Sequence, residues 1–177
     1  IINEVIWYKK NAFPNLTGKR LTASHENLLW THSGGKKRNY YFDYEYSKDG
    51  DFPGDELKKP GKQMRTVWDL SNNKQKDELK YGKHPTKEQQ QKPIKILTRM
   101  IKLASKKGDV MLTPFAGAGS ECVAAKMTGR HYIGFEMEEE YCKIAEERLL
   151  HTEVESGEQM NIFQLTKGVK NDDETSN

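Results

Sequence analysis

The sequence predicts an α/β fold in which helices flank a largely parallel sheet. Between residues 109 and 149, strand-like apolar runs alternate with segments of helical periodicity, and short connections join them. A turn rich in small residues, TPFAGAGS at 113–120, stands where the first of these strands passes into a helix. Strand–helix–strand–helix order with short connections is typical of parallel sheets that helices cover.

The first part of the chain carries two more strand signals. Residues 1–10 form a strand-like run ending in Trp-Tyr-Lys-Lys, and residues 25–30 (HENLLW) form a second one. Pro, Asn and Gly at 13–18 predict a loop between them. Residues 36–83 have turn signals and little periodicity, so mostly loop with short strands is expected there. The tryptophans are expected to anchor the core or loops: Trp7, Trp30 and Trp68.

The second part is more regular. Pro93 opens a helix, and Lys106-Lys-Gly108 ends it with two cations and a glycine. The apolar residues of this helix recur at helical spacing: Ile94, Leu97, Ile101 and Ala104. We then expect a strand at 109–113, a helix at 120–128, a strand at 131–136 and a helix at 139–149. The last helix should turn one apolar face inward: Tyr141, Ile144, Ala145 and Leu149.

Composition bounds the class of protein. A chain of 177 residues fits one domain, and 31% charged residues with a mean hydropathy of −0.92 indicate long exposed segments. No apolar run approaches the length of a membrane span, and no secretory signal is visible. The two cysteines, Cys122 and Cys142, lack metal-ligand spacing, so we expect reduced thiols, no metal and a cytoplasmic protein.

The positive charge gathers in the middle of the chain. Residues 36–100 hold 16 Lys and Arg against 10 Asp and Glu, whereas the remainder holds 13 against 16. Tyr-Tyr-Phe-Asp-Tyr at 40–44 lies beside Lys-Lys-Arg at 36–38. Cations interleaved with aromatic residues suit a nucleic acid. A solvated, loop-rich insertion is the alternative, and composition alone favours it.

The glycine turn departs from the dinucleotide fingerprint G-x-G-x-x-G. Cys122 stands where the third glycine would stand, and Glu121 places a carboxylate where a pyrophosphate would lie. A phosphate ligand is therefore disfavoured. Glu136 ends the next strand, where an acidic residue accepts hydrogen bonds from ribose hydroxyls. A ribose without a phosphate points to S-adenosylmethionine (SAM); the alternative is a surface Glu that opens an acidic helix.

Several ordered motifs together resemble the β-class of DNA amino-methyltransferases, which modify adenine N6 or cytosine N4. The turn PFAGAGS at 114–120, the segment TGRHYIGFE at 128–136, and Glu140-Tyr141 with AEERL at 145–149 match the end of this permuted group. Upstream, the segment KHPT at 83–86 resembles the family's H-P-T-x-K-P element. Residues 6–30 are similar to its strand–loop–strand after the catalytic motif. The resemblance implies a partial, Rossmann-like SAM-dependent methyltransferase fold.

Three features depart from that family. Thr113 replaces the Asp before Pro114 that would help to hold the methionine ammonium, and its hydroxyl or carbonyl can do part of that. The H-P-T-x-K-P element is interrupted, so that either Lys87 or Lys92 takes the Lys position. The catalytic motif Asp/Asn/Ser-Pro-Pro-Tyr/Phe/Trp is absent, since no two of the six prolines are adjacent. In the permuted order of this family it belongs upstream of residue 1, and the start without Met in a strand-like pattern agrees with a fragment or split piece.

The resemblance assigns regions and residues. Residues 1–35 correspond to the end of the catalytic region, 36–80 to a target-recognition insertion, 81–150 to the SAM-binding region and 151–177 to a flexible tail. The expected cofactor-binding residues are Thr86, Thr113, Pro114, Phe115, Gly117, Gly119, Ser120 and Glu136. The expected contacts to DNA phosphates are Arg38, Lys58, Lys59, Lys62 and Arg65.

The resemblance also implies a function. The expected reaction is methyl transfer from SAM to double-stranded DNA at a specific site, with adenine N6 preferred because FPNL at 13–16, Arg20 and His25-Glu26 look most like adenine enzymes. The alternatives are an N4-cytosine enzyme and a non-catalytic DNA- or SAM-binding subunit that completes a split enzyme. A phosphate-binding Rossmann protein is the third.

Overall fold

The computed structural model describes residues 1–34, 40–48, 61–71 and 91–155. Its elements are β1 (Asn3–Tyr8), β2 (His25–Trp30), α1 (Tyr44–Lys48), β3 (Val67–Asp69), α2 (Ile94–Ala104), β4 (Val110–Thr113), α3 (Ser120–Met127), β5 (His131–Gly134) and α4 (Glu139–Leu150). The predicted strands and helices of the second part are all confirmed, and their ends differ from the expected ones by at most two residues. The short helix α1 was not expected.

The N-terminal strands form a three-stranded sheet in the order β2-β1-β3. β1 pairs with β2 in antiparallel fashion and with β3 in parallel, so that Trp7 lies opposite Trp68. Both indole rings are buried, and Trp7 Nε1 donates to the Leu70 carbonyl at 2.6 Å. The predicted role of these tryptophans as core anchors is confirmed. Because β3 lies in this sheet, part of the expected 36–80 insertion belongs to the fold.

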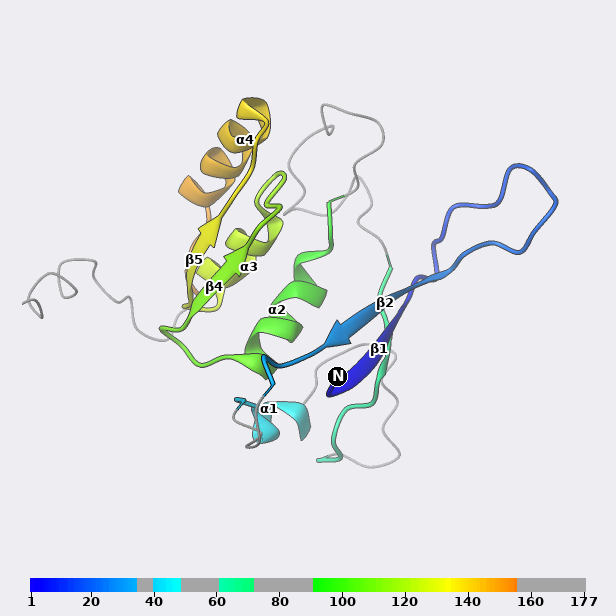
Figure 1. Ribbon diagram of the computed structural model, residues 1–177, viewed down its shortest axis with the longest axis horizontal. Helices are drawn as coiled ribbons and strands as arrows, with labels where there is room; N and C mark the ends of the chain where they lie inside the picture. Colours follow the sequence, from blue (N-terminus) through cyan, green and yellow to red (C-terminus); the bar gives the residue numbers. More distant parts are fainter. Residues whose placement is uncertain (35–39, 49–60, 72–90, 156–177) are drawn as a thin grey trace, which may run out of the picture.

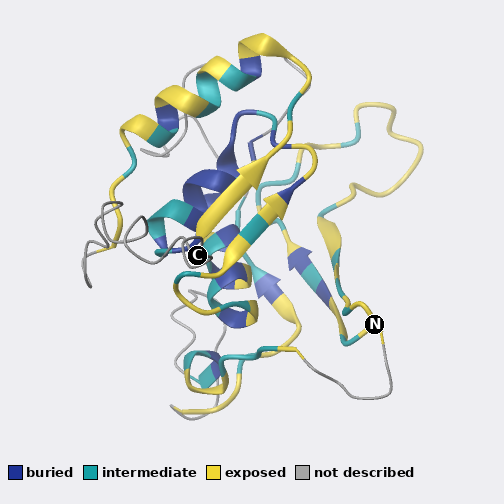
Figure 2. Ribbon diagram, turned by 60° about the vertical axis from the view of Figure 1, so that its left-hand side comes forward, coloured by how far each residue is buried: buried dark blue, intermediate teal, exposed yellow. Residues whose placement is uncertain are grey.

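The second sheet is the parallel pair β4–β5, in which Val110 lies opposite His131 and Thr113 opposite Gly134. α3 contacts both strands and also α2 and α4. One face of the pair is largely uncovered, as the exposed residues of both strands show in Figure 2, and Val110, Leu112 and Ile133 are at least half exposed.

Helix α2 lies between the two sheets (Figure 1) and contributes five of the eleven buried residues of the main hydrophobic cluster. Of the expected stripe, Ile94, Leu97 and Ile101 are buried, whereas Ala104 is exposed at the rim of an apolar hollow of about 350 Å³. The expectation for Ala104 was wrong because this last residue of α2 borders the hollow, whereas the helix before it is covered on two sides. Residues off the stripe are therefore buried as well: Ile96, Arg99 and Leu103.

Arg99 shows how this core accepts a charge. Its guanidinium carbon lies 4.5 Å from the centre of the Trp68 ring, and its Nε donates to Met64 Sδ at 3.1 Å. A cation over an indole face is stabilised by the ring's electrons. No helix within the described part of the chain is long and apolar enough to cross a membrane.

Candidate functional site

The glycine turn joins the carboxyl end of β4 to α3. Gly117 and Gly119 have positive φ angles of 51° and 74°, which favour glycine. The two glycines meet different surroundings. A Cβ on Gly119 would lie 2.7 Å from Ala145 Cβ of α4, whereas a Cβ on Gly117 would meet nothing within 4 Å. Gly119 thus allows α4 to pack on the turn, and Gly117 leaves the outer side of the turn open to a ligand.

In a dinucleotide fingerprint the third glycine lets the helix approach the strand closely. Here a glycine of the strand does so instead. A Cβ on Gly134 of β5 would lie 3.0 Å from Cys122 Sγ, so the small residue stands on the strand and the larger one on α3. Cys122 is buried, and burial raises the pKa of its thiol. Both cysteines are free thiols.

Glu136 connects the end of β5 to the glycine turn. Its Oε2 accepts the Gly117 N–H at 2.8 Å, and its Oε1 accepts the N–H groups of Met137 and Glu138 at 2.8 and 3.0 Å. The bond from Glu138 is the main cause that lowers the pKa of the Glu136 carboxyl, with further bonds from Gly117 and Met137, while partial burial opposes them. The carboxylate is therefore ionised and held at the open side of the turn.

A buried arginine holds the inner side of the same turn. Arg148 of α4 is 8% exposed, and its Nη1 donates to the Ala118 carbonyl and to Ser120 Oγ at 3.0 Å. The sequence analysis assigns no role in the site to Arg148. Its position, seven residues after Tyr141 and three after Ala145, lies on the stripe that was expected to face inward.

The other expected cofactor residues gather at the same place. Thr113 is buried and its carbonyl accepts the Phe135 N–H at 2.9 Å, while Pro114 is exposed and Phe115 is 89% exposed. Ser120 is buried with its hydroxyl turned to Arg148. A hollow of about 700 Å³ lies between the Pro114–Ala116 segment, the end of β5 and α4. No group of three His, Cys, Asp or Glu residues suited to a metal ion occurs among residues 1–34, 40–48, 61–71 and 91–155.

Two of the expected DNA-contact residues are described. Lys62 and Arg65 are both exposed on the segment that leads into β3. The other expected contacts, Arg38, Lys58 and Lys59, lie outside the described residues, as does Thr86. The structure therefore places seven of the eight expected cofactor residues, and they surround one turn.

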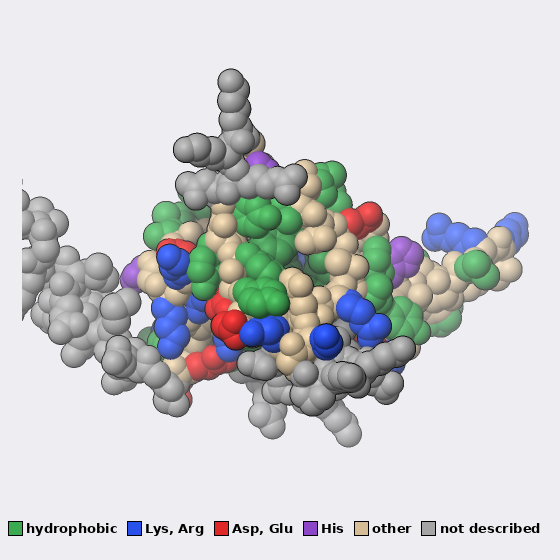
Figure 3. All heavy atoms as spheres, turned by 90° about the horizontal axis from the view of Figure 1, so that it is seen from below, with side chains coloured by type: hydrophobic (Ala, Val, Ile, Leu, Met, Phe, Trp, Pro, Cys, Tyr) green, Lys and Arg blue, Asp and Glu red, His purple; other side chains and the backbone are tan. Residues whose placement is uncertain are grey.

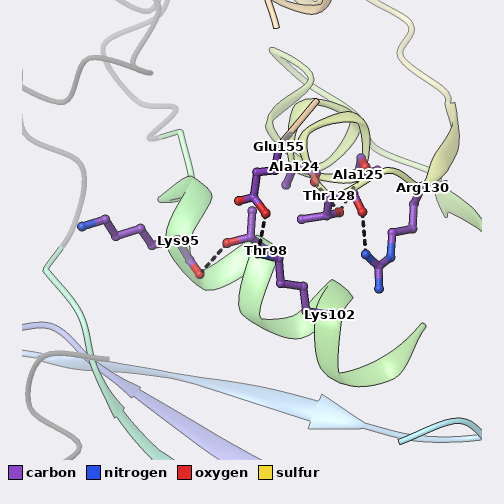
Figure 4. A network of polar contacts seen from close by, with 8 residues as sticks. All are labelled: Lys95, Thr98, Lys102, Ala124, Ala125, Thr128, Arg130 and Glu155. Atoms are coloured by element: carbon purple, nitrogen blue, oxygen red, sulfur yellow. Dashed lines mark hydrogen bonds and ion pairs between the residues drawn. The ribbon is translucent and has the colours of Figure 1, made fainter. Parts of the chain in front are cut away.

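The opposite end of β4–β5 carries a polar network (Figure 4). Arg130 is 9% exposed and donates to the Thr128 carbonyl at 2.5 Å and to the Ser105 carbonyl at 2.6 Å. Thr128 Oγ1 in turn donates to the carbonyl of Ala124 at 2.8 Å. Lys102 of α2 pairs with Glu155 at 2.6 Å.

Comparison with known proteins fits this geometry. The sequence matches the N6/N4 DNA methylase family over residues 1–147. It is 42% identical over 149 residues to the type II methyltransferase M2.LlaDCHI of Lactococcus lactis subsp. cremoris, and 43% identical to M2.DpnII of Streptococcus pneumoniae. Each alignment covers 84% of this chain and 51% of the relative, so the chain spans about half the length of these proteins.

Solved structures show the same fold. M1.HpyAVI in complex with SAM aligns with a TM-score of 0.57 and 26% identity over 84% of this chain and 61% of that one. The cytosine-N4-specific PvuII DNA methyltransferase aligns with a TM-score of 0.62 over 86% of this chain and 52% of that one, and at 17% identity it shows the fold alone. The expected Rossmann-like methyltransferase fold is confirmed, and the chain belongs to the N6/N4 family of DNA methylases.

Proposed function

We propose that this chain is the cofactor-binding part of a site-specific DNA methyltransferase that transfers a methyl group from SAM to double-stranded DNA. The observation that carries the proposal is the ionised Glu136 carboxylate beside the open side of Gly117. SAM supplies a methyl group already activated by its sulfonium. The residues of this chain bind and orient that molecule.

The turn fits SAM better than a phosphate ligand. A carboxylate offers about four acceptor positions, and backbone N–H groups occupy three of those on Glu136, which leaves a position for a ribose hydroxyl. Glu136 and Glu121 both place negative charge near the start of α3, where a pyrophosphate would have to sit. In this proposal the remaining cofactor contacts come from Thr86, Thr113, Pro114 and Phe115.

Two groups needed for the reaction are expected from another segment. An exocyclic amine is a weak nucleophile, so the site must orient it and accept its protons, and a flipped base is held by a stacking aromatic. By the family resemblance these groups lie in the D-P-P-Y-type motif, which the 177 residues do not contain. We propose that an upstream segment or a separate polypeptide supplies it.

The proposed target amine is adenine N6. The support is the similarity of FPNL at 13–16, Arg20 and His25-Glu26 to adenine enzymes. The cytosine-N4 alternative is separated from it by product analysis, since digestion of the methylated DNA to nucleosides yields either N6-methyladenine or N4-methylcytosine.

The proposed DNA contacts of the basic segment are Arg38, Lys58, Lys59, Lys62 and Arg65. Replacing Lys58, Lys59 and Lys62 with Ala should weaken binding to all DNA sequences and flatten its salt dependence, with each true phosphate contact contributing about 0.9 to the slope. If fluorescence anisotropy shows an unchanged salt slope, these lysines are solvated side chains of a loop and do not contact DNA.

The decisive experiment measures tritiated-methyl transfer to unmethylated DNA, with and without the polypeptide that carries the catalytic motif. We expect no transfer by this chain alone and activity after the second polypeptide is added. Robust transfer by the chain alone would contradict our placement of the catalytic motif. In the complete enzyme, Glu136→Ala should weaken SAM binding by ~1–3 kcal/mol in calorimetry, the range for hydrogen bonds to a charged acceptor. Unchanged SAM affinity, or tight binding of NAD, would overturn the cofactor assignment.

A further inference from the structure

A basic arm, residues 9–24, connects β1 to β2 and projects far beyond the rest of the fold (Figure 1). It contains four Lys and Arg residues and no Asp or Glu. β1 and the β4–β5 pair rise in the same direction in Figure 1, so the arm leaves the end of the fold at which the glycine turn lies. None of the residues proposed above to contact SAM or DNA lies in this arm.

The tip of the arm is an ordered turn. Asn15 Oδ1 accepts the Thr17 N–H at 2.9 Å and the Thr17 hydroxyl at 2.6 Å, and Asn15 Nδ2 donates to the Arg20 carbonyl at 3.0 Å. Gly18, with a φ of 63°, completes the turn and donates its N–H to the Asn15 carbonyl. An Asn that bonds its own turn in this way fixes the conformation of the tip before any partner arrives.

Two of the four cations are held against the body and two are at the tip. Lys9 pairs with Glu26 at 2.9 Å and Lys10 with Asp69 at 2.5 Å, both at the base of the arm. Lys19 and Arg20 are exposed, and no salt bridge to them occurs within the described residues. The tip therefore carries uncompensated positive charge.

Large apolar side chains accompany that charge. Phe13 is 72% exposed, and Leu16 and Leu21 are each 94% exposed. Figure 3 shows the arm at the right, with basic and hydrophobic side chains together near its end. A solvent-exposed loop gains nothing from three such residues, so their position is best explained by a partner that covers them.

We infer that the basic arm is a DNA-binding element, in which Lys19 and Arg20 contact phosphates and the apolar residues of the tip press against the bases of the duplex. This inference rests on the proposed function and adds a contact outside the predicted recognition segment. Proteins that disturb base stacking combine basic residues on the backbone with apolar wedges between base steps. A base that leaves the duplex for methylation creates such a need.

Charge favours DNA over a second copy of this chain. Two arms with the same uncompensated cations repel each other, whereas the duplex offers a dense row of phosphates. The arm also extends from the end of the fold at which the glycine turn lies, where the target base must approach the cofactor.

The test is binding of the chain to a fluorescein-labelled duplex of mixed sequence, followed by anisotropy over a range of salt concentrations. Lys19→Ala/Arg20→Ala should lower the salt slope by about 1.8, which is about 0.9 for each phosphate contact. Phe13→Ser/Leu16→Ser/Leu21→Ser should weaken binding several-fold and leave the slope unchanged, because no charge is lost. Lys106→Ala/Lys107→Ala removes the same charge from exposed positions at the opposite end of β4 and should change the slope less than the arm variant.

The outcomes separate the two proposals. The arm variants should keep the wild-type melting temperature, since the substituted side chains of the arm are exposed. If the wild-type chain binds the duplex and the arm variants bind it equally well, the arm inference is wrong and the proposed function stands. The same holds if the Lys106→Ala/Lys107→Ala control lowers the slope as much as Lys19→Ala/Arg20→Ala does. If the chain binds no DNA either alone or together with the polypeptide that carries the catalytic motif, both fall. If the apolar variant instead converts a dimer to a monomer in light scattering without changing DNA affinity, the tip is an interface between copies of the chain.

Discussion

The two ends of the β4–β5 pair contain the same kinds of residue, but only the carboxyl end presents an open turn. Each end has one buried arginine that donates to backbone carbonyls, Arg148 at the carboxyl end and Arg130 at the amino end. Each also has a glycine with a positive φ angle, 74° at Gly119 and 72° at Gly129. At the amino end the arginine bonds carbonyls of the fold, whereas the carboxyl end leaves Gly117 open beside an ionised carboxylate.

This difference shows how hydrogen bonds that stabilise the fold can also position a binding site. At the amino end, losing a contact costs stability alone. At the carboxyl end, the same contacts also set the position of the turn that we propose to hold SAM. Matched substitutions at the two ends therefore separate the free energy of unfolding from ligand affinity.

The largest effect is expected at the glycines. Gly119→Ala places a Cβ 2.7 Å from Ala145 Cβ in a left-handed conformation, while Gly129→Ala shares the conformation and has no neighbour closer than 3.8 Å. The left-handed backbone costs roughly 1–2 kcal/mol in each variant, and overpacking adds about 1–3 kcal/mol at Gly119 alone. Urea unfolding should show the larger loss for Gly119→Ala. Equal losses would mean that α4 shifts away without cost.

The next effect compares the arginines. Arg148→Lys and Arg130→Lys each remove the planar guanidinium that reaches several acceptors at once, and each should lower the free energy of unfolding by about 1–3 kcal/mol. SAM affinity should fall in Arg148→Lys and remain unchanged in Arg130→Lys when both are measured by calorimetry in the complete enzyme. A similar fall in both variants would show that Arg148 acts on stability and not on the turn.

The burial of these two arginines could not be predicted from the sequence. The strands and helices after residue 91 follow from local periodicity, and the glycine turn and Glu136 follow from their motif. Both arginines lie in polar stretches, and their burial depends on segments that are distant in the sequence. Arg148 of α4 bonds Ser120 of the glycine turn, and Arg130 bonds the Ser105 carbonyl just after α2. The pairing of β3 with β1 depends in the same way on a distant partner, because the two strands are far apart in the sequence and the buried Trp68 lies opposite Trp7.

A smaller effect tests the charge at the open end. Glu136→Gln keeps the shape of the side chain and loses its charge, so SAM affinity should fall by about 1 kcal/mol, the difference between charged and neutral hydrogen bonds. Because backbone donors lower the pKa of Glu136 in the fold, its contribution to stability is fully present above the pKa of the unfolded chain and is lost as pH falls through the folded pKa. The difference in stability between wild type and Glu136→Gln should therefore shrink from pH 7 towards pH 3. A difference that grows on acidification would contradict the ionised carboxylate.

The smallest effect is expected at the amino end of β4–β5. The Lys102–Glu155 pair is 2.6 Å long, but its side chains are 29% and 53% exposed, so water and salt screen much of the attraction. A double-mutant cycle with Lys102→Ala and Glu155→Gln should give a coupling of about 0.2–1 kcal/mol that declines as salt is added. The Glu155 N–H donates to the Met127 carbonyl at 2.8 Å, and Glu155→Gln keeps this bond, so the chain after α4 stays in place. SAM affinity should be the same in all members of the cycle, because the pair contacts neither the glycine turn nor α4. A change in SAM affinity here would break the comparison, since it would mean that the two ends of β4–β5 are energetically coupled.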